Sequence, residues 1–161
     1  MPESGQTEVV RALQDAMAIG GLREAVWGIY HDIEEQLQRI RPACAMSGQC
    51  CKFEQYGHRL FVTTAELAVF VLEVRECKEA GLLASGADGG GCRFQQGKWC
   101  AVHANRPMGC RLFFCDASHE QELRDLYETM HGRIKALHDR LGIAYLYMEW
   151  RGALSSAMAM L

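Results

Sequence analysis

The sequence contains no run of about 18 uninterrupted apolar residues, so it predicts no membrane-spanning helix. It has no cluster of lysine and arginine, and its formal net charge is only −3, so nucleic-acid binding is not expected. The opening residues lack a basic segment followed by an apolar run, which argues against a signal peptide and favours a cytoplasmic protein. Neither the paired C-x-x-C motif typical of zinc ribbons nor the cysteine spacing of ferredoxins occurs, so spacing identifies neither protein class.

The chain does contain eight cysteines. Stable disulfides are uncommon in the reducing cytoplasm, so metal ligation or burial as small apolar groups explains these thiols better. Cys77 stands alone at helical spacing on an apolar face, and we interpret it as a packing residue. The other seven form two groups on turn-rich sequence, which are Cys44, Cys50 and Cys51, and Cys92, Cys100, Cys110 and Cys115.

Thiolates favour zinc ions and iron–sulfur clusters, so the two groups predict a sulfur-rich metal site if the fold brings them together. The nearest approach to a zinc motif is Cys100-Ala-Val-His103, which makes His103 a candidate nitrogen ligand. Adjacent side chains point in different directions, so one of Cys50 and Cys51 could be a bystander. Residues 44–116 carry a formal charge of +1 between acidic flanks, which would suit an anionic cofactor.

The segment "CRFQQGKWCAVHANRPMGCRLF" resembles the signature of the YkgJ-like cysteine-cluster family, described as zinc- or iron-chelating. The family's upstream hallmark, C-x-x-C-x-x-C-C, resembles "CAMSGQCC" in this chain, and the likeness covers roughly residues 43–115. The positions that match the two halves of the pattern are Cys44, Cys50, Cys51, Cys92, Cys100, Arg106, Pro107, Cys110 and Arg111.

Three positions depart from the family pattern. Ser47 replaces the second cysteine of the upstream motif, His103 replaces the usual tyrosine, and Cys115 is additional. Some relatives are described as flagellin lysine methylases with an iron–sulfur cluster. The resemblance therefore implies a metal centre and leaves a protein-modifying enzyme as one alternative.

We expect a four-thiolate site, with a four-iron–four-sulfur cluster as the favoured cofactor. Zinc, held by four cysteines or by three cysteines and one histidine, is the alternative. The centre would be structural or would carry electrons. Arg106 and Arg111 would offset its negative charge by donating to sulfur or to carbonyl groups, with surface salt bridges as the alternative. The expected ligands are Cys92, Cys100, Cys110 and one of Cys50 and Cys51, with Cys44, Cys115 and His103 as further candidates.

The predicted fold is a mainly α single domain, residues 1–161, with short β-strands and a loop-rich cysteine core over about residues 43–115. Its N-terminal helical segment, 7–41, would break at Gly20-Gly21, and its apolar face is expected to pack in the core, with a protein partner as the alternative. We expect His131 and His138 to be solvated on the flank of the last long helix. The remaining elements are a helix from the capping box Thr63–Glu66 to Gly81, a helix over 118–141 from the box Ser118–Gln121 to Gly142, strands at 59–62 and 143–149, and a connecting loop at 85–91.

Overall fold

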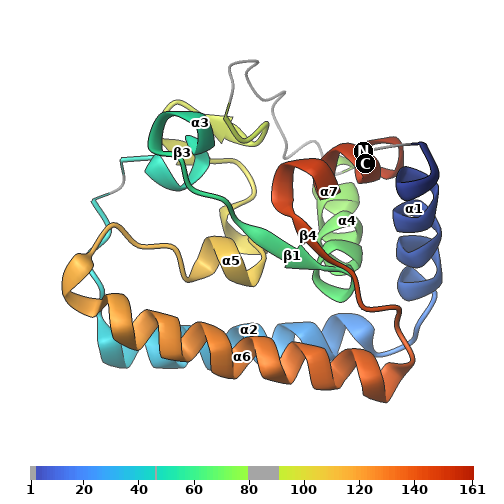
Figure 1. The fold of residues 1–161 in the computed structure, drawn as a ribbon, viewed down its shortest axis with the longest axis horizontal. Coiled ribbons are helices and arrows are strands. Elements are labelled where there is room, and N and C mark those ends of the chain that lie inside the picture. Colours follow the sequence, from blue (N-terminus) through green and yellow to red (C-terminus); the bar gives the residue numbers. More distant parts are fainter. Residues whose placement is uncertain (1–2, 46, 80–90) are drawn as a thin grey trace.

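The computed structural model describes residues 3–45, 47–79 and 91–161 and is mainly helical, as expected from the sequence (Figure 1). No helix in these residues is long and apolar enough to cross a membrane. Helices α2 and α6 run side by side along one edge, and α1 packs on α4 and α7 (Figure 1). The helices are α1 (Glu3–Met17), α2 (Leu22–Ile40), α3 (Phe53–Tyr56), α4 (Thr64–Glu79), α5 (Met108–Arg111), α6 (Glu120–Leu141) and α7 (Trp150–Ala157).

Two small antiparallel sheets complete the described architecture. Strand β1 (Phe61–Thr63) pairs with β4 (Tyr147–Glu149), and β2 (Gln95–Gln96) pairs with β3 (Trp99–Cys100) as a tight hairpin. The β1–β4 pair joins segments that are far apart in the sequence and places α7 beside α4. Single 3₁₀ turns lie at Gln49–Cys51, His103–Asn105, Ala117–His119 and Met158–Met160.

Helix α4 lies at the centre of the core, so its first turns are buried on nearly every side. The predicted capping box at its start is confirmed: the Thr63 amide donates to Glu66 Oε2 (3.1 Å), and the Glu66 amide donates to Thr63 Oγ1 (3.4 Å). Glu66 Oε1 also accepts from the hydroxyl of Tyr30 on α2 (3.2 Å) and from the amide of Met108 on α5 (2.8 Å). Burial raises the pKa of this carboxyl group.

Two helix starts differ from the sequence prediction. Helix α1 begins at Glu3, before Thr7. The box between Ser118 and Gln121 does not form, because Asp116 accepts from the Ser118 amide (3.0 Å) and caps a 3₁₀ turn instead, and α6 begins at Glu120. Asp116 is only two residues from Ser118, so its bond to the Ser118 amide forms in place of the capping box with Gln121.

Other predicted boundaries are confirmed. The break at Gly20-Gly21 separates α1 from α2, and Gly142 ends α6 in the left-handed conformation (φ 66°). The predicted helix end at Gly81 and most of the glycine-rich loop, 85–90, lie outside the described residues. The expectation for His138 was wrong: it is 1% exposed, and its Nε2 accepts from the amide of Ala65 at the start of α4 (3.3 Å).

Candidate metal centre

Five thiols from the two cysteine groups line one small, enclosed cavity of about 20 Å³. The 3₁₀ turn of Gln49–Cys51 provides two of them, the hairpin segment around β2 and β3 provides two, and α5 provides the fifth. Two parts of the chain that are distant in sequence, 50–51 and 92–110, therefore meet at this cavity. The five are Cys50, Cys51, Cys92, Cys100 and Cys110, and the rest of the wall comes from Phe53, Phe70, Val102, Arg106, Pro107 and Trp150.

Backbone hydrogen bonds set the positions of these segments. The Cys92 amide donates to the carbonyl of Cys51 (2.8 Å), which joins the two cysteine groups directly. Gly91 allows this approach, since a Cβ atom there would lie 2.8 Å from the Cys51 carbonyl oxygen. On the third segment the Cys110 amide donates to the Pro107 carbonyl (3.0 Å), which fixes the start of α5. The thiols are thus placed by main chain rather than by contacts among themselves.

Cys51 lies at the centre of the thiol group. Its Sγ is 3.9 Å from that of Cys50, and it also interacts with the thiols of Cys92 and Cys100. Contact with Cys51 lowers the pKa of each of these three neighbours, while the same contacts raise the pKa of Cys51 itself. Burial raises the pKa of Cys110. The neighbours of Cys51 thus have thiolate character, which is the form that binds metals.

Trp150, the first residue of α7, places a hydrogen-bond donor in this cavity. Its side chain is buried, and its indole Nε1 has no hydrogen-bond partner of normal geometry in the described chain. The pKa of Cys92 is lowered first by its contact with Cys51, and the nearby indole N–H adds a smaller effect in the same direction. A buried N–H without a neutral acceptor is costly, whereas a thiolate beside it would accept the bond. The orphaned donor therefore fits a cavity whose sulfur atoms are ionised.

The spacing of the thiols can be compared with that of a metal site. Four sulfur atoms about 2.3 Å from one tetrahedral ion lie about 3.8 Å from each other, close to the 3.9 Å between Cys50 and Cys51. Within residues 3–45, 47–79 and 91–161, however, no set of three or more His, Cys, Asp or Glu side chains has an arrangement that could hold a metal ion as it stands. One pair of thiols therefore has the separation of metal ligands, while the five together are not directed at one centre.

Arg106 and Arg111, the two arginines that match the family pattern, have different surroundings. Arg106 lines the thiol cavity, and its Nε and Nη1 donate to the carbonyls of His103 (3.0 Å) and Cys110 (3.2 Å). Arg111 is not part of the cavity wall. It is 3% exposed, donates to the Arg106 carbonyl (2.6 Å) and pairs with Glu34 on α2 (2.6 Å). Arg111 therefore ties the loop before α5 to the long helices, whereas Arg106 is next to the sulfur atoms.

The remaining candidate ligands lie outside the five-thiol cavity. Cys44 and Cys115 are exposed thiols, and together with His103 they line a larger cavity of about 550 Å³ that shares Cys50, Cys51 and Cys100 with the first. Cys77 lines neither cavity, and its Sγ accepts from Asn105 Nδ2 (3.6 Å). Five of the eight cysteines thus line the inner cavity, two line only the larger adjoining cavity, and Cys77 lines neither.

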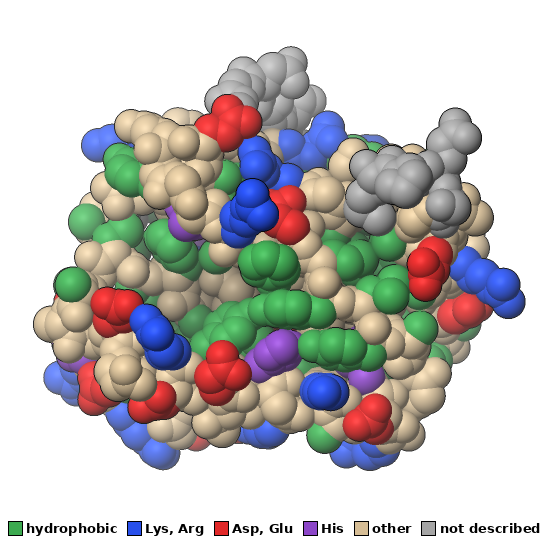
Figure 2. Space-filling model, in the orientation of Figure 1, with side chains coloured by type: hydrophobic (Ala, Val, Ile, Leu, Met, Phe, Trp, Pro, Cys, Tyr) green, Lys and Arg blue, Asp and Glu red, His purple; other side chains and the backbone are tan. Residues whose placement is uncertain are grey.

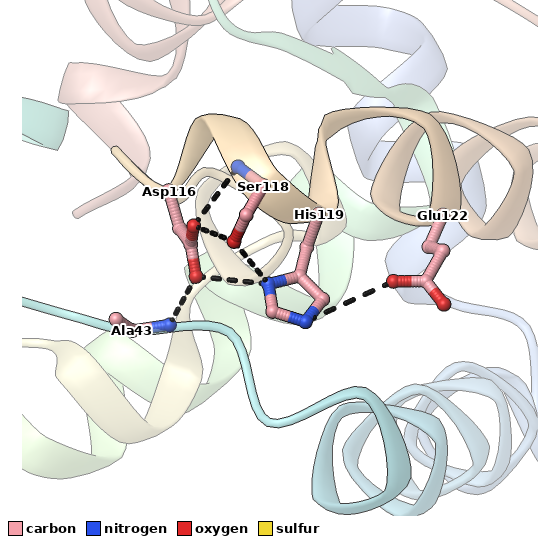
Figure 3. Close-up of polar contacts among 5 residues, drawn as sticks. All are labelled: Ala43, Asp116, Ser118, His119 and Glu122. Atoms are coloured by element: carbon pink, nitrogen blue, oxygen red, sulfur yellow. Dashed lines mark hydrogen bonds and ion pairs between the residues drawn. The ribbon is translucent and has the colours of Figure 1, made fainter.

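A serine, a histidine and an aspartate meet near the start of α6, beside Cys115 (Figure 3). Asp116 accepts from the amide of Ala43 (2.8 Å) and lies 2.9 Å from His119 Nδ1, which is also 3.0 Å from Ser118 Oγ. Hydrogen bonds from the Ser118 hydroxyl, first, and from the Ala43 amide lower the pKa of Asp116. The hydroxyl and the carboxylate contact the same ring nitrogen, whereas a nucleophile triad needs them on opposite nitrogens. These contacts connect the chain just after α2 to the start of α6.

A third cavity, of about 530 Å³, is bounded by β1, β4, α5 and the first half of α6. Hydrophobic side chains gather with a histidine near the middle of the face that Figure 2 shows. Tyr147 stacks on Phe61 (5.1 Å between ring centroids) and on His131 (4.6 Å). Arginines and acidic residues both line this cavity, so its charges largely offset each other.

Sequence reasoning missed the aromatic wall of the thiol cavity. Trp150 and Phe70 make an edge-to-face contact there (5.0 Å between centroids), from two helices that flank no cysteine motif. The available signal was weak: Trp150 follows a predicted strand, and Phe70 falls in an apolar helix of ordinary composition.

Comparisons with protein-family models, with curated proteins and with solved structures found no match for this chain.

Proposed function

We propose that the protein binds a thiolate-ligated metal centre at the five-thiol cavity and that this centre is structural. The observation that carries the proposal is the convergence of Cys50, Cys51, Cys92, Cys100 and Cys110 on one enclosed cavity. The lowered pKa of Cys50, Cys92 and Cys100, beside an unpaired indole N–H, suits ionised sulfur ligands. The resemblance of residues 43–115 to a zinc- or iron-chelating family agrees with this function.

A structural role follows from how the ligands are distributed. They lie on a 3₁₀ turn, a two-residue-strand hairpin and a four-residue helix, none of which has enough backbone hydrogen bonds to be stable alone. An ion that holds several of these thiolates would clamp all three segments together, since its binding free energy is then also folding free energy. Cys51, which contacts three other thiols, would be the central ligand.

The dimensions of the cavity favour a single Zn²⁺ ion. A space of about 20 Å³ suits one ion held by thiolates, while a four-iron cluster needs more room. An iron–sulfur cluster is the second candidate, because five thiols are present and an adjoining cavity of about 550 Å³ could admit a larger group. All eight cysteines are free, so we place the protein in a reducing compartment such as the cytoplasm.

Metal analysis of protein purified without oxygen tests this function. We expect about one zinc per chain, no acid-labile sulfide and a colourless solution. Replacement of the zinc by Co²⁺ should produce the intense thiolate-to-cobalt absorption of a sulfur-rich tetrahedral site.

The possible results separate the two candidates from each other and from failure. Iron and sulfide in equal amounts, with a brown colour, would establish the second candidate in place of zinc. Protein that holds no metal as purified, and that gives no thiolate-to-cobalt absorption when Co²⁺ is added under reducing conditions, would overturn the metal centre altogether.

A further inference from the structure

The larger cavity beside the thiols has a floor made by the candidate metal ligands. It encloses about 550 Å³, within the range of small-molecule sites, and Cys50, Cys51 and Cys100 belong to its wall as well as to the inner cavity. Aromatic rings supply much of the remaining wall, with Phe113 and Phe114 on one side and Trp99 on another. A molecule in this cavity would therefore contact both the thiols and the aromatic side chains of the wall.

Apart from the cysteines, the ionisable side chains that line this cavity are basic. Lys98, His103 and Arg106 line it, and no aspartate or glutamate does. Burial first, and then the nearby Arg106, lower the pKa of His103, so the positive charge at neutral pH comes from Lys98 and Arg106. Arg106 uses only Nε and Nη1 for carbonyls, and neither cation forms a salt bridge within the part of the chain that is described. Lys98 and the remaining guanidinium N–H groups of Arg106 are therefore the charged donors that this cavity offers to an anionic group.

Trp99 is the most exposed of the large hydrophobic side chains described, at 65%. The hairpin that carries it is nevertheless held in place: Gln95 Nε2 donates to the carbonyls of Gly48 (3.3 Å) and Gly97 (2.9 Å). Gly48 is in the left-handed conformation (φ 71°), and a Cβ there would approach Lys98 Cα to 3.2 Å, so only glycine lets the two loops meet closely. An exposed indole on a hairpin whose position is held, in the wall of this cavity, is available for stacking.

We propose that this cavity binds a small planar molecule that combines an aromatic body with one anionic group, such as an aromatic carboxylate or sulfonate. The aromatic body would stack on Trp99 and pack against the phenylalanines, and the anion would accept hydrogen bonds from Lys98 and from the unused guanidinium N–H groups of Arg106. The inference rests on the proposed function in one respect, namely that metal-bound thiolates form the floor of the site.

The experiment uses anilinonaphthalene sulfonate, a fluorescent planar anion, and its uncharged analogue phenylnaphthylamine as probes of the metal-loaded full chain. We expect one saturable site for the sulfonate, energy transfer to it from tryptophan, and at least about tenfold weaker binding of the uncharged analogue, since a hydrogen bond to a charged group contributes about 1.5–3 kcal/mol.

Lys98→Gln should weaken sulfonate binding by about tenfold and leave binding of the uncharged probe unchanged. Lys135→Gln is the matched control: Lys135 lies on α6, near Tyr145 and not in this cavity, and its loss should change neither affinity. Trp99→Ala should weaken both probes, because it removes the stacking surface. Equal affinity of the wild type for both probes, or an unchanged sulfonate affinity in Lys98→Gln, would refute the site.

Metal content is measured on the same samples, so the two proposals can fail separately. Protein that holds its metal yet shows no saturable sulfonate site refutes the ligand site and leaves the metal centre intact. Protein without metal that still binds the sulfonate in a Lys98-dependent way refutes the metal centre and leaves the ligand site standing. A folding defect is excluded by comparing the thermal unfolding of Lys98→Gln with that of the wild type.

Discussion

The helical body, formed by α1, α2, α4 and α6, and the thiol region, residues 47–56 and 91–115, are stabilised in different ways. The body buries long apolar faces around α4, and its interior polar groups are paired. The thiol region consists of single turns, four-residue helices and two-residue strands, and it adds a few apolar residues to the same core around a small cavity lined by five thiols. We therefore expect the body to fold through hydrophobic burial and the thiol region to gain stability from the proposed metal centre.

The largest test of this difference is Cys51→Ser. Loss of the central thiol should abolish stoichiometric metal binding and lower the free energy of unfolding by about 4 kcal/mol, a size typical of losing a metal site. Metal analysis and urea unfolding in parallel would measure both effects. Cys77→Ser, in α4 and outside the thiol cavity, is the control and should keep its metal. Similar metal content in the two variants would contradict the assignment of Cys51.

Glu66→Ala should have the next largest effect, because Glu66 joins the two regions. Its carboxylate accepts from Tyr30 in the body and from the amide of Met108 at the start of α5, and both donors are buried. Removing it leaves several buried donors unpaired, so we expect a loss of about 3 kcal/mol in the free energy of unfolding. Glu66→Gln, which keeps the shape and one carbonyl oxygen, should cost less. Equal costs for the two variants would show that the second carboxylate oxygen, and not the volume of the side chain, dominates here.

Trp150→Phe would sharpen the comparison within the thiol region. Phenylalanine keeps most of the packing against Phe70 but removes the indole N–H beside Cys92. Loss of an outer donor to a ligand typically weakens metal binding at least about tenfold, so competition with a chelator should show that decrease in affinity. Thermal stability of the metal-free protein should change little in comparison. An unaltered metal affinity would mean that the N–H makes no bond to sulfur.

The smallest expected effect is a pH dependence located in the body. Burial lowers the pKa of His138, and its Nε2 accepts a hydrogen bond from Ala65, which requires the neutral ring. The unfolded chain takes up this proton near pH 6.5 while the folded one does so only at lower pH, so stability is complete above pH 6.5 and falls as the pH drops below it.

Urea midpoints of the wild type and of His138→Gln at pH 7.5 and pH 5.5 would measure this dependence. The variant should lose less stability on acidification than the wild type does. His31→Gln, at an exposed position of α2, should lose as much stability between pH 7.5 and pH 5.5 as the wild type does. Parallel losses in the wild type and His138→Gln would exclude His138 as the source.

The sequence allowed the body to be predicted because its signals are local. The break at Gly20-Gly21, the capping box at Thr63 and the end of α6 at Gly142 each depend on residues within one or two turns. Asp116 shows where this fails, since a competing side chain two residues before Ser118 decided the helix start. His138 was misjudged because whether a helix flank is solvated depends on which element covers it.

The candidate site could be predicted only in part. The two cysteine groups and Arg106 follow from spacing and from the family pattern, and the structure brings them to adjoining cavities. The separation of Arg106 from Arg111 depends on α2, which lies outside the motif. Trp150 and the charges of the larger cavity arise from contacts between distant segments, and no local pattern specifies these.

The position of Trp150 in the chain has a consequence for biosynthesis. Every cysteine of the cavity precedes this residue in the sequence, so during translation all five thiols emerge before the side chain that closes their cavity. Until α7 docks through β1 and β4, these sulfur atoms are open to oxidants and to the wrong metal ions. Loading of the proposed metal centre would therefore depend on how fast the chain is completed relative to the oxidation and metal-binding reactions of its thiols.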